Sequence, residues 1–194
     1  MKYNLSEITE VIKNRRTIYP EFFSERKVHR EIVEKLLNNA IWAPTHGLTQ
    51  PWRFKVFMND ARARLSDFLS NLYKEKNQGE KFNEKKFENL KNRPLKSSVV
   101  IAICMERDPK GRISELDEIM ATAAAVENMM LTATAYGLGT FWATPALINT
   151  PEVRSFLKIE NGLCLGFLYI GYPANEWPKG QRKPIEYVTE FFEE

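Results

Sequence analysis

The stretch APTHGLTQPWRF, residues 43–54, joins a loop braced by Pro44 and Pro51 to a segment with the period of a strand. The loop offers polar side chains for hydrogen bonding, namely Thr45, His46, Thr49 and Gln50. Residues 52–58 alternate between apolar and mostly polar side chains, which predicts a half-buried strand. A rigid loop of this composition can hydrogen-bond the edge of a planar, largely apolar ring.

A first helix upstream ends in the triplet Arg15-Arg16-Thr17. Paired arginines can bind a phosphomonoester, because a guanidinium fork matches phosphate oxygens bidentately. FMN combines a phosphate with a planar, largely apolar ring, so the two segments together look like a flavin site. Each segment taken singly has a structural alternative. The arginines can complement the C-terminal end of their helix, and His46 can be a solvated loop residue.

Length and composition predict one domain over residues 1–194. The chain is 43% hydrophobic, enough for one core and too short for two typical enzyme domains. No apolar run reaches the roughly 20 residues that cross a bilayer, so we expect a cytoplasmic protein without a membrane partner. Cys104 and Cys164 lie in apolar runs without metal-ligand spacing, and we expect buried structural thiols and no metal.

Residues 74–96 form a charged segment that we consider a candidate for mobility. It holds eight basic and four acidic residues, a net charge of +4 in a chain whose total is +3. A basic stretch with interleaved aromatic residues can be a nucleic-acid surface. Mixed charges at helical spacing favour a solvated helix face instead, so we expect no nucleic-acid partner.

The remaining pattern mixes helices and strands without a repeating unit. We expect a first helix capped by Ser6, a third capped by Asp60, and further elements at residues 30–42 (helix), 99–105 (strand), 115–136 (helix) and 163–170 (strand). The tail over 174–194 ends in apolar residues that a surface arm cannot bury alone: Ile185, Tyr187, Val188, Phe191 and Phe192. We therefore expect the tail to dock on a partner subunit in a homodimer.

Taken in order, these motifs resemble the FMN-dependent nitroreductase family, in particular its short members. The resemblance is carried by RRT at Arg15, WAPTHGLTQPWRF at Trp42, AAAVENMMLTATAYGLGTFWAT at Ala123, LGFLYIGYP at Leu165 and RKPIEYV at Arg182. It implies an α+β, nitroreductase-like fold with a central, mostly antiparallel sheet flanked by helices. It also implies an intertwined homodimer whose two FMN sites are shared between subunits.

The resemblance assigns roles to residues of this chain by position. In one subunit it implies binding of the phosphate and ribityl chain by Arg15, Arg16 and Thr17. From the other subunit, Trp42 and His46 would approach the same flavin. The remaining implied FMN contacts are Gln50 in the loop, Trp142, Ala143 and Thr144 along the ring, and Arg182 or Lys183 at the phosphate.

The family activity implied is that of an oxidoreductase that uses NADH or NADPH to reduce nitroaromatics, quinones or related acceptors. No GxGxxG follows a predicted strand, so donor and acceptor would occupy one pocket in turn, in a ping-pong cycle. The hydride chemistry would belong to FMN, and we expect no catalytic side chain. Two alternatives stay open: a specialised flavin enzyme of the same superfamily (reductive dehalogenation or flavin breakdown), and a flavin-binding or nucleic-acid-binding protein without turnover.

Overall fold

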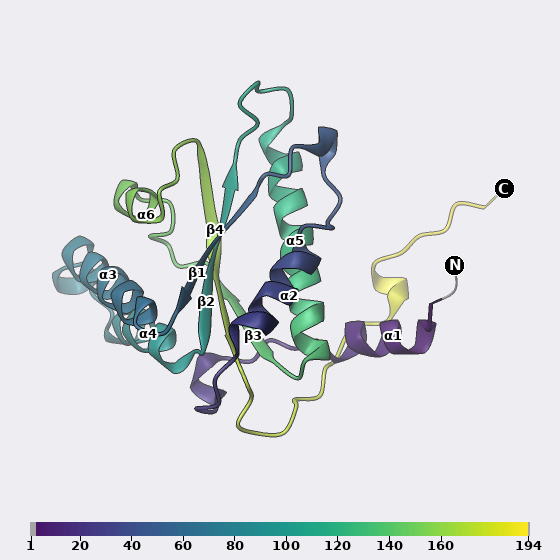
Figure 1. The fold of residues 1–194 in the computed structure, drawn as a ribbon, viewed down its shortest axis with the longest axis horizontal. Helices are drawn as coiled ribbons and strands as arrows, with labels where there is room; N and C mark the ends of the chain where they lie inside the picture. Colours follow the sequence, from purple (N-terminus) through teal and green to yellow (C-terminus); the bar gives the residue numbers. More distant parts are fainter. Residues whose placement is uncertain (1–2, 194) are drawn as a thin grey trace.

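The core of the protein is a four-stranded antiparallel sheet with the strand order β1-β2-β4-β3 (Figure 1). The computed structural model describes residues 3–193. The strands are β1 (Trp52–Met58), β2 (Val99–Glu106), β3 (Gly139–Ala143) and β4 (Gly162–Gly171). The expected α+β architecture with an antiparallel sheet is therefore confirmed.

Helices cover both faces of the sheet. One face carries α2 (Arg30–Ala40) and α5 (Glu115–Ala135), and the other carries α3 (Ala61–Lys76), α4 (Glu84–Lys96) and α6 (Pro151–Leu157) (Figure 1). The central strand β2 is buried on both sides because its side chains alternate between the two cores. Ile101 packs on the α2 and α5 side, whereas Ala102 packs on the α3 and α6 side. This explains the continuous apolar run over residues 99–105.

Several expected element boundaries hold and others need correction. The N-cap of α1 (Leu5–Asn14) is Asn4 and not Ser6, because the Asn4 side chain accepts from the N–H groups of Ser6 and Glu7. The helix predicted over residues 30–42 ends at Ala40. Asp60 precedes α3 as expected, although its side chain makes no capping hydrogen bond.

The charged segment over residues 74–96 is the turn and second arm of a helical hairpin. It comprises the last turn of α3, a short 3-10 turn (η3, Gly79–Lys81) and α4. Both cysteines are buried and face each other across β2 and β4, which confirms the expected placement of the thiols. Within residues 3–193, no helix is both long and apolar enough to cross a membrane.

Helix α1 (Leu5–Asn14) and the described C-terminal tail extend from the body beyond α5 (Figure 1). Helix α1 contains no buried residue, and its Ile8 and Ile12 side chains are 47% and 55% exposed. The apolar face expected there is thus largely exposed among the described residues, with Val11 half-buried. The C-terminal tail is likewise extended, and its apolar residues Ile185, Tyr187, Val188, Phe191 and Phe192 are between 63% and 88% exposed.

Candidate functional site

The loop between α2 and β1 has an unusual backbone. Gly47, Leu48 and Gln50 have positive φ angles of 59°, 55° and 46°. A left-handed backbone is unfavourable for residues with a side chain, and such residues collect at binding sites. The loop closes on itself, because the Thr45 hydroxyl accepts from the Gln50 N–H at 3.2 Å and lies 3.3 Å from the Thr49 hydroxyl.

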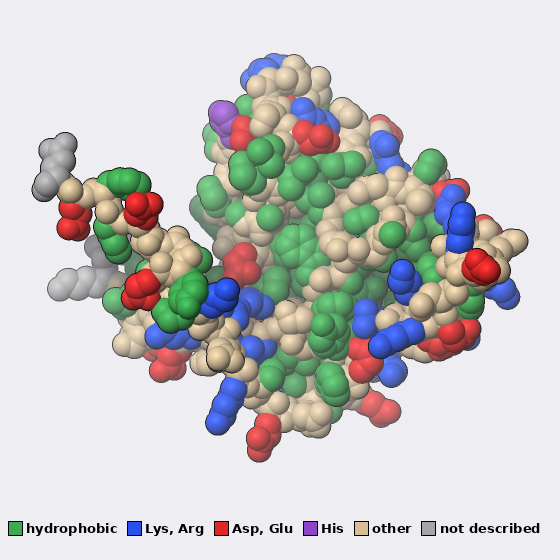
Figure 2. All heavy atoms as spheres, turned by 180° about the vertical axis from the view of Figure 1, so that it is seen from behind, with side chains coloured by type: hydrophobic (Ala, Val, Ile, Leu, Met, Phe, Trp, Pro, Cys, Tyr) green, Lys and Arg blue, Asp and Glu red, His purple; other side chains and the backbone are tan. Residues whose placement is uncertain are grey.

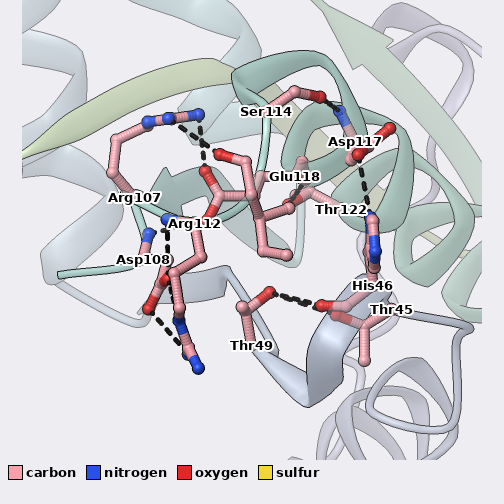
Figure 3. Close-up of polar contacts among 11 residues, drawn as sticks. Thr45, His46, Thr49, Arg107, Asp108, Arg112, Ser114, Asp117, Glu118 and Thr122 are labelled. Atoms are coloured by element: carbon pink, nitrogen blue, oxygen red, sulfur yellow. Dashed lines mark hydrogen bonds and ion pairs between the residues drawn. The ribbon is translucent and has the colours of Figure 1, made fainter. Parts of the chain in front are cut away.

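His46 fastens this loop to the first turn of α5 (Figure 3). Its Nδ1 lies 3.0 Å from Oδ2 of Asp117, a residue that the sequence analysis did not single out. Hydrogen bonds from His46 and from Ser114 hold the pKa of Asp117 below its usual range. The outer side of the loop is open, with Trp42 and Leu48 83% and 80% exposed. The loop is therefore anchored from behind and presents apolar side chains outward.

A buried carboxylate supports the same end of α5. The Glu118 side chain is fully buried; its Oε1 accepts from the Asp108 N–H at 2.6 Å, and its Oε2 lies 2.7 Å from Nη1 of Arg107. The second contact is ionic and not a directed hydrogen bond. Arg112 in turn pairs with the Asp108 carboxylate at 3.0 Å. These contacts fix the turn before α5, and the acidic first turn of that helix was the only sequence signal for them.

The predicted phosphate-binding triplet lies at the other end of α5. The Arg15 Nε is 3.7 Å from Oε1 of Glu127, and the Arg15 side chain is 17% exposed. Arg16 donates from Nη1 to the carbonyls of Lys13 and Arg15, and from Nε to that of Pro178. Among the described residues, Arg15 therefore has a single, long ionic contact, whereas Arg16 joins the end of α1 to the C-terminal segment.

The C-terminal segment packs against this triplet before it leaves the body. Trp177 Nε1 donates to the Asn14 carbonyl at 2.6 Å. Gly180 lies so close to Arg16 that an added Cβ would stand 2.2 Å from the guanidinium carbon. Beyond it, Arg182 and Lys183 are exposed: Arg182 bonds the Gln181 carbonyl, and the Lys183 ammonium lies 5.3 Å from the Tyr187 ring centre. Arg182 and Lys183, the two predicted phosphate ligands of this segment, thus lie on the exposed C-terminal arm.

Strand β3, at the edge of the sheet, carries the segment predicted to line the ring. Trp142 Nε1 donates to the Leu165 carbonyl at 2.9 Å, across the neighbouring strand. Gly166 permits this approach, because a Cβ at that position would lie 2.5 Å from the Trp142 Nε1. Trp142, Ala143 and Thr144 border a cavity of about 730 Å³ on the α4 side of the strand.

One chain brings some of the predicted site residues together and separates others. Thr17 forms a parallel bridge with Thr140, so the triplet and Trp142–Thr144 lie along one sheet edge. Trp42, His46 and Gln50 lie elsewhere. His46 contacts Asp117 of α5, whereas Arg15 contacts Glu127 of the same helix. These two positions are ten residues apart, or about 15 Å along the helix. A single chain therefore holds two separate parts of the predicted site.

Comparison with known proteins identifies the family. The model of the nitroreductase family matches residues 12–172, a range that contains Arg15 to Thr17, the loop and β3. The chain belongs to the nitroreductase family. Among curated relatives, "Putative NAD(P)H nitroreductase YdjA" of Escherichia coli K12 is 29% identical over 147 residues, which cover 74% of this chain and 76% of that protein.

Solved structures of nitroreductases share the fold over nearly the whole chain. A nitroreductase-like family protein from Bacillus cereus is 29% identical, with a TM-score of 0.82 over 100% of this chain and 99% of its own. The FMN-dependent nitroreductase NfnB of Mycobacterium smegmatis, solved in complex with NADPH, has a TM-score of 0.75 at 19% identity, covering 97% and 99% of the two chains. At that identity, NfnB supports the fold alone.

Proposed function

We propose that the protein is an FMN-dependent oxidoreductase that uses NADH or NADPH to reduce nitroaromatics, quinones or related acceptors. Family membership supports an oxidoreductase, and YdjA is named for NAD(P)H. NfnB, which shares the fold, is described as FMN-dependent and was solved with NADPH. The extension of these properties to this chain rests on the geometry of the β3 edge.

The observation that carries the proposal is the alignment of two predicted contact groups along β3. Thr17 is bridged to Thr140, and its neighbour Ile18 donates to the Thr140 carbonyl at 2.9 Å. Thr144 is four residues further along, a distance of about 13 Å in extended chain. The ribityl phosphate tail of FMN is an extended chain on this scale. A flavin lying along the strand would have its phosphate near Arg15 and its ring near Trp142.

The cations at this edge and on the C-terminal arm fit an anionic ligand. Arg15 has only its long contact with Glu127, and within residues 3–193 neither Arg182 nor Lys183 forms an ion pair. These cations can therefore bind a phosphate without losing a close partner. Arg16 differs, since its Nη1 and Nε already donate to backbone carbonyls. We assign to Arg16 the placing of the C-terminal segment beside the phosphate.

We further propose a homodimer in which each site combines residues of both subunits. The loop with Trp42 and His46 contacts α5 about 15 Å along the helix from the point where Arg15 contacts it, and the loop's Trp42 side chain is exposed. The exposed apolar side chains of α1 and of the C-terminal tail would leave large apolar patches on a monomer. A second copy would cover these patches and bring its loop to the flavin bound at β3.

The division of labour between cofactor and protein follows from the side chains present. Bound FMN supplies the two-electron chemistry. The cations of the chain would hold the phosphate, Trp142 and β3 would lie beside the ring, and Trp42 and Leu48 of a partner's loop would shield it from water. The scheme needs no nucleophile from the protein, and the protons consumed when an acceptor is reduced would come from solvent.

The experiment that tests the proposal is purification followed by assay with and without an acceptor. We expect a yellow protein that releases FMN on denaturation and oxidises NADH or NADPH faster when menadione or nitrobenzene is added. A yellow protein without such turnover would support a flavin-binding role instead. A colourless protein that gains no turnover when FMN is supplied would contradict the proposal.

A further inference from the structure

A cavity of about 730 Å³ lies between β3 and the α3–α4 hairpin. Its floor is apolar, with Leu90, Phe141, Leu147 and Tyr169 among the residues that line it. Its side toward Trp142 and Thr144 adjoins the edge at which the proposed flavin ring lies. A cavity of this volume accommodates a drug-sized molecule.

The rim of the cavity is cationic. Four basic residues line it, Lys76, Lys81, Lys86 and Arg93, and no acidic residue of the described chain does so. Figure 2 shows the molecule from behind the view of Figure 1. Lys and Arg side chains lie toward the right of the picture, on the side of α3 and α4, and hydrophobic side chains lie across its middle.

Two of these four cations are already paired with carboxylates. Lys76 pairs with Glu152 at 2.8 Å, and Arg93 pairs with Glu21 at 2.9 Å while its guanidinium carbon lies 4.9 Å from the Phe141 ring centre. Within residues 3–193, the ammonium groups of Lys81 and Lys86 have no ion-pair partner. An anion entering the cavity would therefore meet two unpaired positive charges.

We propose that this cavity selects electron acceptors that carry a carboxylate on an aromatic ring. The ring would rest on the apolar floor beside β3, next to the flavin edge, and the carboxylate would lie at the rim near Lys81 and Lys86. This inference rests on the proposed function, because it names the substrate class of the same site. The apolar floor beside a cationic rim matches an aromatic acid better than a neutral ring or a purely ionic ligand.

The test compares two acceptors that differ in charge and little in shape, 4-nitrobenzoate and 4-nitrobenzamide. For the holoenzyme as purified, we expect kcat/KM to be higher for the benzoate. In the variant Lys81→Gln/Lys86→Gln, the ratio of the two kcat/KM values should fall about fivefold, since two partly exposed charges are lost. Calorimetric binding of 4-nitrobenzoate to the enzyme without NAD(P)H should weaken by a similar factor.

The matched control is Lys74→Gln/Lys85→Gln, which removes the same charge from exposed positions of the hairpin that do not line the cavity. We expect it to keep the wild-type ratio. If both double variants lower the ratio equally, or neither does, the assignment is wrong. A raised KM for NAD(P)H with an unchanged ratio would assign the lysines to the donor's phosphates and also overturn it.

Failure of this inference is distinguishable from failure of the proposed function. Turnover of 4-nitrobenzamide without any preference for the benzoate would leave the oxidoreductase intact and remove only the acceptor class. A protein without FMN or without turnover of either compound would remove the proposed function, and the calorimetric comparison would still decide whether the cavity binds the carboxylate.

Discussion

His46 and Asp117 join the loop after α2 to the first turn of α5 through a contact of 3.0 Å between Nδ1 and Oδ2. Because the contact lowers the pKa of Asp117, its stabilising effect should be present above the ordinary aspartate value of about 3.9 and disappear as the pH falls through the lower folded value. The free energy of unfolding of Asp117→Asn should therefore lie below that of wild type at pH 6, and the difference should shrink below about pH 4.

Urea unfolding at a series of pH values measures this difference. Glu115→Gln is the control, since Glu115 is an exposed carboxylate in the same helical turn. A difference that persists unchanged at pH 2 would show that another property of the substitution causes it. Amide hydrogen exchange at pH 7 should also be faster over residues 45–50 in Asp117→Asn than in the control.

The buried carboxylate of Glu118 should contribute much more to stability. Its side chain is fully buried, and Glu118→Ala would leave the Asp108 N–H and Nη1 of Arg107 without their partner. We expect the free energy of unfolding to fall by about 3 kcal/mol. This value is at the lower end of the range for breaking a buried ion pair, because the Arg107 side chain is 23% exposed. The melting temperature should fall by roughly 6 to 12 °C at fixed protein concentration. A fall no larger than that of Glu115→Ala would contradict the argument.

Arg15 and Arg16 should separate into two phenotypes. Arg15→Ala should lose bound FMN with little change in melting temperature, because its one ionic contact is 3.7 Å long. Arg16→Ala should be destabilised by about 1 to 3 kcal/mol, because its hydrogen bonds to three carbonyls are lost. The double variant should be colourless and folded. FMN content is read from absorbance and stability from thermal unfolding.

Arg16→Lys distinguishes the two possible roles of that position. Lysine keeps the charge and cannot reproduce the guanidinium fork. Retained FMN with lowered stability would support the structural role of Arg16. Lost FMN with unchanged stability would make it a phosphate ligand in its own right.

Turnover should follow ping-pong kinetics, since donor and acceptor are expected to use one pocket in succession. Initial rates at varied NAD(P)H and varied acceptor should give parallel lines in double-reciprocal plots. Intersecting lines would indicate a ternary complex and hence a separate site for the nicotinamide donor.

Shared sites can be tested by mixing two inactive variants. In one variant, His46→Asp would place a second carboxylate beside Asp117 and displace the loop. In the other variant, Arg15→Ala would weaken phosphate binding. After joint unfolding and refolding, half of randomly paired dimers are heterodimers with one intact site of two, so activity should recover to about a quarter of wild type. No recovery, with dimers verified by light scattering, would place each site within one chain.

The sequence by itself determined the elements and the family. Apolar runs and alternation located β1, β2, β4 and α5, because burial imposes a period that a local window contains. The prolines, the triplet at Arg15 and the loop identified the family, since these motifs are short and contiguous. The buried Cys104 and Cys164 followed from the same apolar runs.

Only the tertiary structure decided how the candidate site is divided. Arg16 bonds the carbonyl of Pro178, 162 residues away, and Glu118 finds Arg107 across a turn, so neither role can be read from local periodicity. The charges of residues 74–96 suggested a solvated helix face, yet packing of the hairpin beside β3 directs Lys81 and Lys86 to a cavity. The physical reason is that hydrogen bonds and ion pairs act over a few ångströms in space, whatever the separation along the chain.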